Sequence, residues 1–223
     1  INELIKCLGT DNWVLLSTLE LMGGVTLQVS EPVTSHTKRY VRCFWGLDRG
    51  RAQARFYPAI HPLQSYSEDA ANLSDWWIRH GNPNWQEQRE TILVLLEEQT
   101  KLERMARIVG KDALPPGQQL KLLCADLVDN AYLRQSAFSP VDRYCSPERQ
   151  TLMLRLILQF FDLAERAVNA GVAPDSIAES PFYRALSRMS EEIGEDRLDA
   201  FEDLTQQMEQ ELSDLKRSVA DAV

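Results

Sequence analysis

The spacing of the apolar residues changes along the chain near Ser67, and the change predicts two kinds of structure. Before Ser67, β-branched and aromatic residues gather in short runs at positions 13–19 and 40–45, with glycine and proline between them. Runs of this kind predict short strands joined by loops. After Ser67, apolar residues recur every three or four positions, which is the pattern of helices with one buried face.

The first helix is predicted to begin behind Asn84 and to end at Gly110. Asn84 is a favoured N-cap residue, and Glu87 follows it at the spacing of a capping box. Glycine is common directly after a helix because it has no Cβ atom to clash there. A second helix is predicted from about Gln118 to Arg134 on the same periodicity.

The third helix has the clearest predicted start. Ser146 is placed as its cap, Pro147 stands in the first turn and Glu148 lies near the positive end of the helix dipole. This helix is predicted to run to Gly171.

The last helix is predicted from about Asp196 to Ala220, with a seam of residues alternately three and four apart. The seam consists of Leu198, Phe201, Thr205, Met208, Leu212, Leu215 and Val219. Such a seam fits either packing on the core of its own domain or contact with a partner helix.

The composition is that of a folded globular protein, since 44% of the 223 residues are hydrophobic and 26% are charged. The formal net charge is −9. Nucleic-acid binding needs clustered basic residues, so the charge argues against a nucleic-acid partner. The patterns together predict an α+β fold that is mostly α, with a small β-rich region at residues 1–70 and an all-helical domain at residues 71–223.

The residues that could bind metal are scattered. The four cysteines are Cys7, Cys43, Cys124 and Cys145, and the three histidines are His36, His61 and His80. Neither set has the spacing of zinc ligands, so no metal site is predicted. Isolated cysteines of this kind are typical of reduced, cytosolic proteins.

The sequence holds none of the common catalytic signatures: no GxxxxGK[ST] phosphate loop, no GxGxxG, no GxSxG and no HExxH. Its one Gly-Lys pair, at Gly110, follows a predicted helix instead of preceding one. The chain alone is therefore expected to lack catalytic activity. Its start at Ile1, without methionine, favours an internal piece of a longer protein.

Three segments stand out against this background. They read SEPVT at residues 30–34, FYPAIHPLQSYS at residues 56–67 and AFSPVDRYCSPE at residues 137–148. In this order and at these distances they resemble the catalytic A subunit of V-type and archaeal-type rotary ATPases. The corresponding segments of that family read like SEPVT, FPAINWLxSYS and AFxxVDxYCSPEKQ, and the resemblance covers essentially the whole chain.

The resemblance implies that the chain is the C-terminal part of such a subunit. It would comprise the trailing strands of a RecA-like α/β nucleotide-binding domain, followed by a C-terminal helical bundle domain. The phosphate loop and the magnesium-binding region would lie upstream. The full-length subunit would bind ATP or ADP with Mg²⁺ and would couple ATP hydrolysis or synthesis to the movement of protons or sodium ions.

The resemblance also implies partners and a location. Three catalytic subunits would alternate with three noncatalytic B subunits around the subunits of a central shaft. The complex would lie on the cytoplasmic face of a membrane, which the catalytic subunit would meet only indirectly, through the ion-translocating sector.

Two aromatic residues are the candidate binding site. The resemblance places Tyr57 and Phe138 as walls that face the adenine of a bound nucleotide, where neither takes part in the chemistry. From the residues alone, Tyr57 fits a half-buried aromatic at the end of a strand equally well. Arg49, Arg51 and Arg55 could neutralise phosphate charge, although three arginines in an exposed loop are common.

A second candidate site is the connection between the first two predicted helices. It consists of Lys111, Asp112, Ala113, Leu114, Pro115 and Pro116. The residues alone predict a turn that two prolines stiffen. The resemblance places it at the tip that meets the rotating shaft. As a surface turn, it is expected to tolerate the removal of residues 114–116 without unfolding.

The sequence departs from the family pattern in two places. Five residues stand at positions 25–29 where relatives have two. In the second place Tyr57 stands where A subunits usually carry phenylalanine and His61-Pro62 where they carry Asn-Trp, so this segment looks more like that of the related F-type β subunit. The altered loop at 25–29 and the weakly acidic tip, where only Asp112 is acidic, leave open an alternative of another class, a noncatalytic helical interaction module that derives from the family and no longer binds nucleotide. An intact phosphate loop upstream would favour the catalytic subunit over the module.

Overall fold

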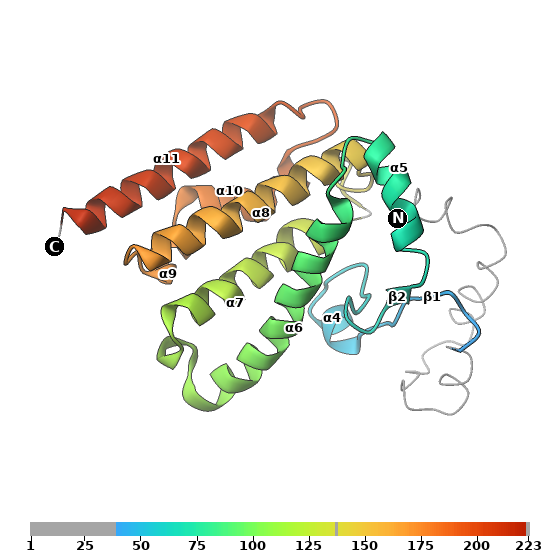
Figure 1. The fold of residues 1–223 in the computed structure, drawn as a ribbon, viewed down its shortest axis with the longest axis horizontal. Helices are drawn as coiled ribbons and strands as arrows, with labels where there is room; N and C mark the ends of the chain where they lie inside the picture. Colours follow the sequence, from blue (N-terminus) through green and yellow to red (C-terminus); the bar gives the residue numbers. More distant parts are fainter. Residues whose placement is uncertain (1–38, 137, 222–223) are drawn as a thin grey trace. The chain divides into compact units, whose positions relative to one another are not determined.

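The computed structural model describes residues 39–136 and 138–221 (Figure 1). The chain divides into two compact units, Ile1–Val41 and Arg42–Val223, and every element described below belongs to the second. Three features of the sequence lie outside the described residues: the predicted strand at 13–19, the departure at 25–29 and the SEPVT segment at 30–34.

A two-stranded antiparallel sheet and a short helix form the first part of the second unit. Strand β1 (Cys43–Phe44) pairs with β2 (Tyr66–Ser67). Between them lies α4 (Arg49–Gln53), and the Oδ1 atom of its N-cap residue Asp48 accepts a hydrogen bond of 2.6 Å from a backbone N–H of the first turn. The strand predicted at 40–45 is confirmed for two residues only, because the chain then leaves the ladder to enter α4.

The helical region opens with η2 (Ala71–Leu73) and α5 (Ser74–Arg79), which lead into the long helix α6 (Trp85–Val109). Helix α6 confirms the first predicted helix. Gly110 ends it with φ at +90°, a conformation that residues with a Cβ atom rarely adopt. The predicted capping box is wrong, because Asn84 lacks the extended backbone of a capping residue and its side chain makes no hydrogen bond to the first turn.

The second predicted helix begins earlier and ends differently. One 3-10 turn, η3 (Lys111–Ala113), precedes α7 (Pro116–Val128), which has proline in its first turn. The chain then continues as a π-helical turn, η4 (Asp129–Leu133), in which Arg134 N donates to Asp129 O at 2.9 Å. The helix predicted as far as Arg134 is therefore α-helical only to Val128.

Helix α8 (Pro147–Asn169) confirms the third predicted helix and its start. Ser146 Oγ accepts a hydrogen bond of 3.0 Å from Arg149 N, and Glu148 lies in the first turn. Gly171, with φ at +96°, stands just beyond the end of the helix.

Two shorter helices, α9 (Pro174–Ala178) and α10 (Pro181–Glu192), were not expected from the apolar spacing. Ser180 caps α10 through its Oγ, which accepts from Tyr183 N at 3.2 Å. The pair Ser180-Pro181 repeats the Ser-Pro start of α8. The signal for α10 was therefore present in the sequence.

Helix α11 (Ala200–Ala220) confirms the last predicted helix, although it starts four residues later than expected. Its seam faces the core of its own domain, because Phe201, Met208 and Leu212 are each no more than 2% exposed. For these residues the alternative of contact with a partner helix is therefore wrong.

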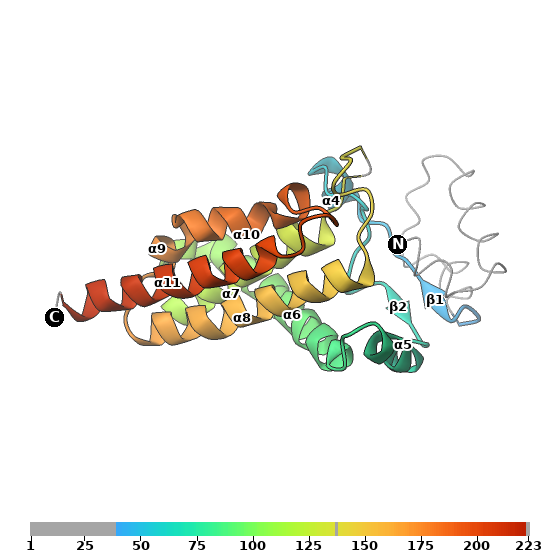
Figure 2. The ribbon, with the colours of Figure 1, turned by 90° about the horizontal axis from the view of Figure 1, so that it is seen from above.

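Helices α7, α8, α10 and α11 pack side by side around one hydrophobic core (Figures 1 and 2). Helix α8 contacts both α7 and α11 along its length. Its residues Ile157 and Phe160 are fully buried, and the Phe160 ring centroid lies 6.2 Å from that of Phe182 on α10.

The observed architecture confirms an α+β fold that is mostly α, with a small sheet followed by a C-terminal helical domain. The RecA-like origin of the first part and a domain boundary at residue 70 stay predictions. None of the helices in the described part of the chain combines the length and the apolar character needed to cross a membrane.

Candidate functional site

Helix α7 joins the two candidate sites that the sequence singled out. The tip (residues 111–116) leads into it, and the Phe138 loop (residues 134–136 and 138–146) follows its π-helical extension (Figure 1). At 1.5 Å per residue, the 13 residues of α7 span roughly 20 Å. The two sites therefore lie at opposite ends of one helix.

The structure brings the two predicted adenine-pocket segments into contact. Gln135 N donates a hydrogen bond of 2.7 Å to the carbonyl oxygen of Tyr57. The side chains of both candidate residues are open to solvent, with Phe138 99% exposed and Tyr57 55% exposed. Core packing therefore does not account for the Phe138 ring.

A second contact joins the elements just before these segments, α4 and η4. Arg51 Nη1 forms an ion pair of 2.9 Å with Asp129 Oδ1, the first residue of η4, and both side chains are mostly buried. Two guanidinium groups lie near the Phe56 ring, with the Cζ atom of Arg51 5.3 Å and that of Arg134 5.9 Å from its centroid. Of the three arginines considered for phosphate, Arg51 is thus already engaged by a carboxylate.

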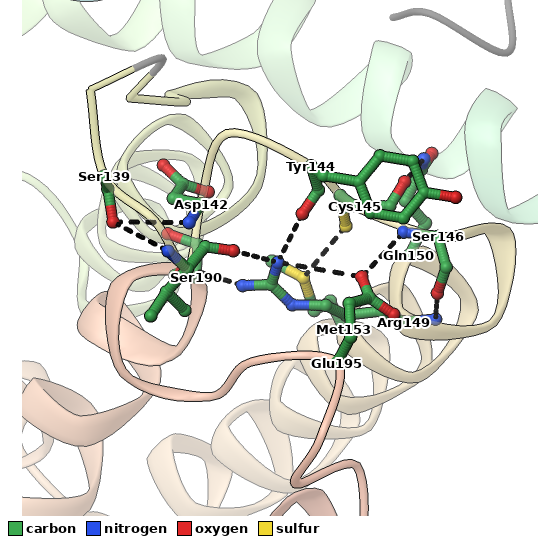
Figure 3. A network of polar contacts seen from close by, with 11 residues as sticks. Ser139, Asp142, Tyr144, Cys145, Ser146, Arg149, Gln150, Met153, Ser190 and Glu195 are labelled. Atoms are coloured by element: carbon green, nitrogen blue, oxygen red, sulfur yellow. Dashed lines mark hydrogen bonds and ion pairs between the residues drawn. The ribbon is translucent and has the colours of Figure 1, made fainter.

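Arg149 lies beneath the Phe138 loop and is completely buried (Figure 3). Its Nη1 atom donates to the carbonyl oxygens of Val141 and Tyr144, each at 3.0 Å, and its Nη2 atom donates to the carbonyl of Ser190 at 2.6 Å. Glu195 Oε1 lies 4.0 Å from Nη1. The guanidinium therefore ties the loop to the end of α10.

Asp142 fixes the start of the same loop. Its Oδ2 atom accepts a hydrogen bond of 2.6 Å from Ser136 N. The Oγ atom of Ser139 accepts from the backbone N–H groups of Val141 and Asp142 at 3.3 Å (Figure 3). Burial raises the pKa of the Asp142 carboxyl above its ordinary value. The loop is thus held by polar groups at both ends.

Two further groups complete this network. Glu195 Oε1 accepts a hydrogen bond of 2.8 Å from Ser146 N, so the connection between α10 and α11 also touches the start of α8. Burial raises the pKa of the Cys145 thiol to about 11, and its Sγ atom lies 4.0 Å from Met153 Sδ. This thiol is neutral at physiological pH and is a poor nucleophile.

Sequence reasoning missed Arg149. The available signal was its position on the apolar face of α8, where a charged residue is out of place unless it is paired. Within residues 39–136 and 138–221, no group of three or more His, Cys, Asp or Glu side chains could hold a metal ion.

The tip is built differently, around a small apolar cluster. Leu114 is only 6% exposed and packs with Leu102 and Leu122, with Ala106 beside them. Gln119 Nε2 donates to Leu114 O at 2.8 Å. The expectation that residues 114–116 form a dispensable surface turn is therefore wrong, because removing Leu114 would open this cluster.

Apolar side chains also lie open to solvent beside the tip. Ile108 is 85% exposed, Val109 56% and Met105 42%, all in the last two turns of α6. Lys111, Asp112, Ala113, Pro115 and Pro116 are exposed as well. The tip thus combines a buried anchor with an exposed apolar surface.

Comparisons with known proteins point to one family. Residues 74–177 match the family model described as the C-terminal domain of V and A type ATP synthase. The V-type ATP synthase alpha chain of Halothermothrix orenii is 36% identical over 206 residues, which are 92% of this chain and 35% of that protein. The A subunit of the A-type ATP synthase of Desulfurococcus sp. is 39% identical over 183 residues, which are 82% of this chain and 31% of that protein.

The same similarity holds for the A subunit of the A-type ATP synthase of Thermococcus kodakarensis, 38% identical over 208 residues. The chain spans about a third of the length of these relatives. A solved structure described as a unique ATP synthase subunit NeqB from Nanoarcheaum equitans matches with a TM-score of 0.52 and 20% identity, over 62% of this chain and 32% of that one. That likeness concerns the fold alone.

Proposed function

Because this chain belongs to the family of A-type and V-type ATP synthase A subunits, we propose that it is the C-terminal part of the catalytic subunit of a rotary ATPase. Tyr57 and Phe138 would form walls of the adenine pocket, and the tip would pass movement to the central shaft. The observation that carries the proposal is the hydrogen bond from Gln135 N to the carbonyl oxygen of Tyr57, two residues 78 positions apart, in segments whose aromatic residues Tyr57 and Phe138 are both exposed.

An exposed aromatic ring leaves apolar surface in contact with water, which is unfavourable. A ligand that covers the ring removes this surface from water, and this contributes to its affinity. A purine stacked on such a ring gains a further 0.5–1.5 kcal/mol, roughly, beyond area burial. Phe138 and Tyr57 would therefore supply base affinity. Lysine, Mg²⁺ and a neighbouring arginine stabilise the transferring phosphoryl group in phosphate-loop enzymes, and that chemistry would belong to other parts of the complex.

The tip is suited to a mechanical role by its stiffness. Leu114 anchors it to both flanking helices, and the two prolines fix their own φ angles near −65°. Displacement of the tip would be transmitted along α7, whose inner face is packed into the core, to η4 and the Phe138 loop. The exposed apolar residues beside the tip fit contact with a shaft subunit, and the B subunits would complete the hexamer.

The adenine pocket is tested by substitution in the full-length subunit assembled with its partners. Phe138→Ala and Tyr57→Ala should each raise KM for ATP several-fold with little change in kcat, because the base contact is equal in the ground and transition states. Tyr144→Ala is the matched control, since its ring is also exposed and stands in the same loop. Unchanged KM in both variants would contradict the pocket and favour the noncatalytic interaction module.

The proposed contact of the tip with the central shaft is tested separately, with a variant that leaves the buried Leu114 unchanged. Ile108→Asp places a charge on the exposed apolar surface beside the tip and should lower the number of ions moved per ATP hydrolysed in reconstituted vesicles. Val94→Asp is the control, because Val94 is also exposed on α6 but lies roughly 20 Å from Ile108 along the helix axis. An unchanged ratio in Ile108→Asp would remove this surface from the coupling path.

A further inference from the structure

We propose that Arg149 is the positioning residue of the Phe138 loop: it fixes the loop backbone and thereby the direction in which the Phe138 ring is presented to the base. The inference rests on the proposed role of Phe138 in the adenine pocket. Arg149 itself is completely buried and would touch no nucleotide.

The position of Phe138 between two anchors is the first argument. Two residues before it, Ser136 N is held by Asp142 at 2.6 Å, and three residues after it, Val141 O is held by Arg149 at 3.0 Å. Hydrogen bonds to backbone groups on both sides of Phe138 reduce the conformations open to those groups. The Phe138 side chain is thus exposed, while backbone groups before and after it are held in place.

The shape of the guanidinium is the second argument. Its planar donors reach Val141 O, Tyr144 O and Ser190 O at the same time, so one side chain joins the loop to α10. A lysine ammonium is a single tetrahedral centre and does not reproduce this fork.

The consequence for binding follows from the population of loop conformers. If the hydrogen bonds from Arg149 to the loop are weakened, only a fraction of the molecules present the Phe138 ring correctly. The apparent affinity for the base then falls in proportion to that fraction. A loop that is correctly placed between a third and a tenth of the time would raise KM for ATP about 3- to 10-fold. The rate at saturating ATP would change little.

The test is a double-mutant cycle in the full-length assembled subunit, with KM and kcat for ATP measured for wild type, Arg149→Lys, Phe138→Ala and the double variant. Arg149→Lys should raise KM about 3- to 10-fold with kcat within about twofold of wild type. In the Phe138→Ala background the same change should have no further effect, because the ring that Arg149 positions is gone. Arg155→Lys, on the exposed face of α8, is the matched control.

The outcomes separate this inference from the proposed function. An equal rise in KM with and without Phe138, or no rise at all, would overturn the positioning role while leaving the adenine pocket intact. No effect of Phe138→Ala alone would overturn the adenine pocket and the inference together. If Arg149→Lys does not fold, Glu195→Ala takes its place in the cycle, since Glu195 is partly exposed and lies 4.0 Å from Arg149. It should give a smaller rise in KM that also depends on Phe138.

Discussion

The connections at the two ends of α7 are held in place by different forces. At the tip, Leu114 is anchored by apolar contacts with Leu102 and Leu122. At the Phe138 loop, a buried arginine and a buried aspartate hold the backbone through directed hydrogen bonds. Apolar contacts are non-directional and fix proximity, whereas hydrogen bonds also fix orientation. The role proposed for the tip, transmitting force, requires only proximity, whereas the role proposed for the loop, presenting an aromatic ring, requires a fixed orientation.

The largest expected effect comes from removing the hydrogen bonds that Arg149 donates to the loop and to Ser190. Arg149→Met should lower the free energy of unfolding by roughly 3–5 kcal/mol, because it leaves three backbone carbonyls without their donor in a buried site. Urea unfolding of the isolated chain measures the change, with Arg155→Met as the exposed control. A loss of unfolding free energy no larger than that of the control would show that the hydrogen bonds of Arg149 do not stabilise the protein.

Truncating Leu114 should destabilise the protein less than replacing Arg149 does. Leu114→Ala should lower the free energy of unfolding by about 2–3 kcal/mol, at the low end for leucine truncation because the cluster is small and lies near the surface. Ile108→Ala, 85% exposed in the neighbouring helix, should change it very little. Equal losses in the two variants would contradict the view that Leu114 anchors the tip.

The ion pair between Arg51 and Asp129 should contribute about 1–2 kcal/mol to the free energy of unfolding. This lies between the values for exposed and for buried ion pairs, because both side chains are mostly buried. Arg51→Met, Asp129→Asn and the double variant form a cycle whose coupling energy reports the pair itself. The coupling should weaken as salt is raised. No coupling would mean that the ion pair does not help to hold the Phe138 end of α7.

The smallest expected effect is a difference in how stability depends on pH between variants at the two ends of α7. The pKa of Asp142 is raised by burial above its ordinary 3.8, so its contribution to stability is greatest below pH 3.8 and declines as the pH rises through the raised value. Asp142→Asn, which keeps an acceptor for Ser136 N, should therefore gain stability relative to wild type across that window. Leu114→Ala should run parallel to wild type over the same range. Parallel curves for both variants would contradict the polar account of the loop.

Much of the helical fold could be predicted from the sequence, because its signals are local. Apolar spacing, the Ser146-Pro147 start and the position of Gly110 are read within a few residues, and α6, α8 and α11 follow them. The π-helical turn η4 could not be predicted in this way. Its Asp129 is paired with Arg51, which is 78 residues distant in the sequence.

The candidate site residues come from the motif resemblance and stay predictions, whereas the groups that hold them in place could not be predicted from the sequence. The motif resemblance singled out Tyr57 and Phe138, and the structure brings their segments together through Gln135. Arg149 was missed because its partners are backbone carbonyls, which carry no side-chain signature. Leu114 was mistaken for part of a surface turn because its partners lie on two different helices.

The most direct test of the central claim, that Tyr57 and Phe138 face adenine, is photolabelling of the full-length assembled protein with an azidoadenine nucleotide. After irradiation, digestion with trypsin would release residues 56–79 and 135–143 as separate peptides, since arginines stand at positions 55, 79, 134 and 143. The account predicts ATP-protectable label on one or both of these peptides, and loss of label from residues 135–143 in Phe138→Ala. ATP-protectable label confined to other peptides would contradict it.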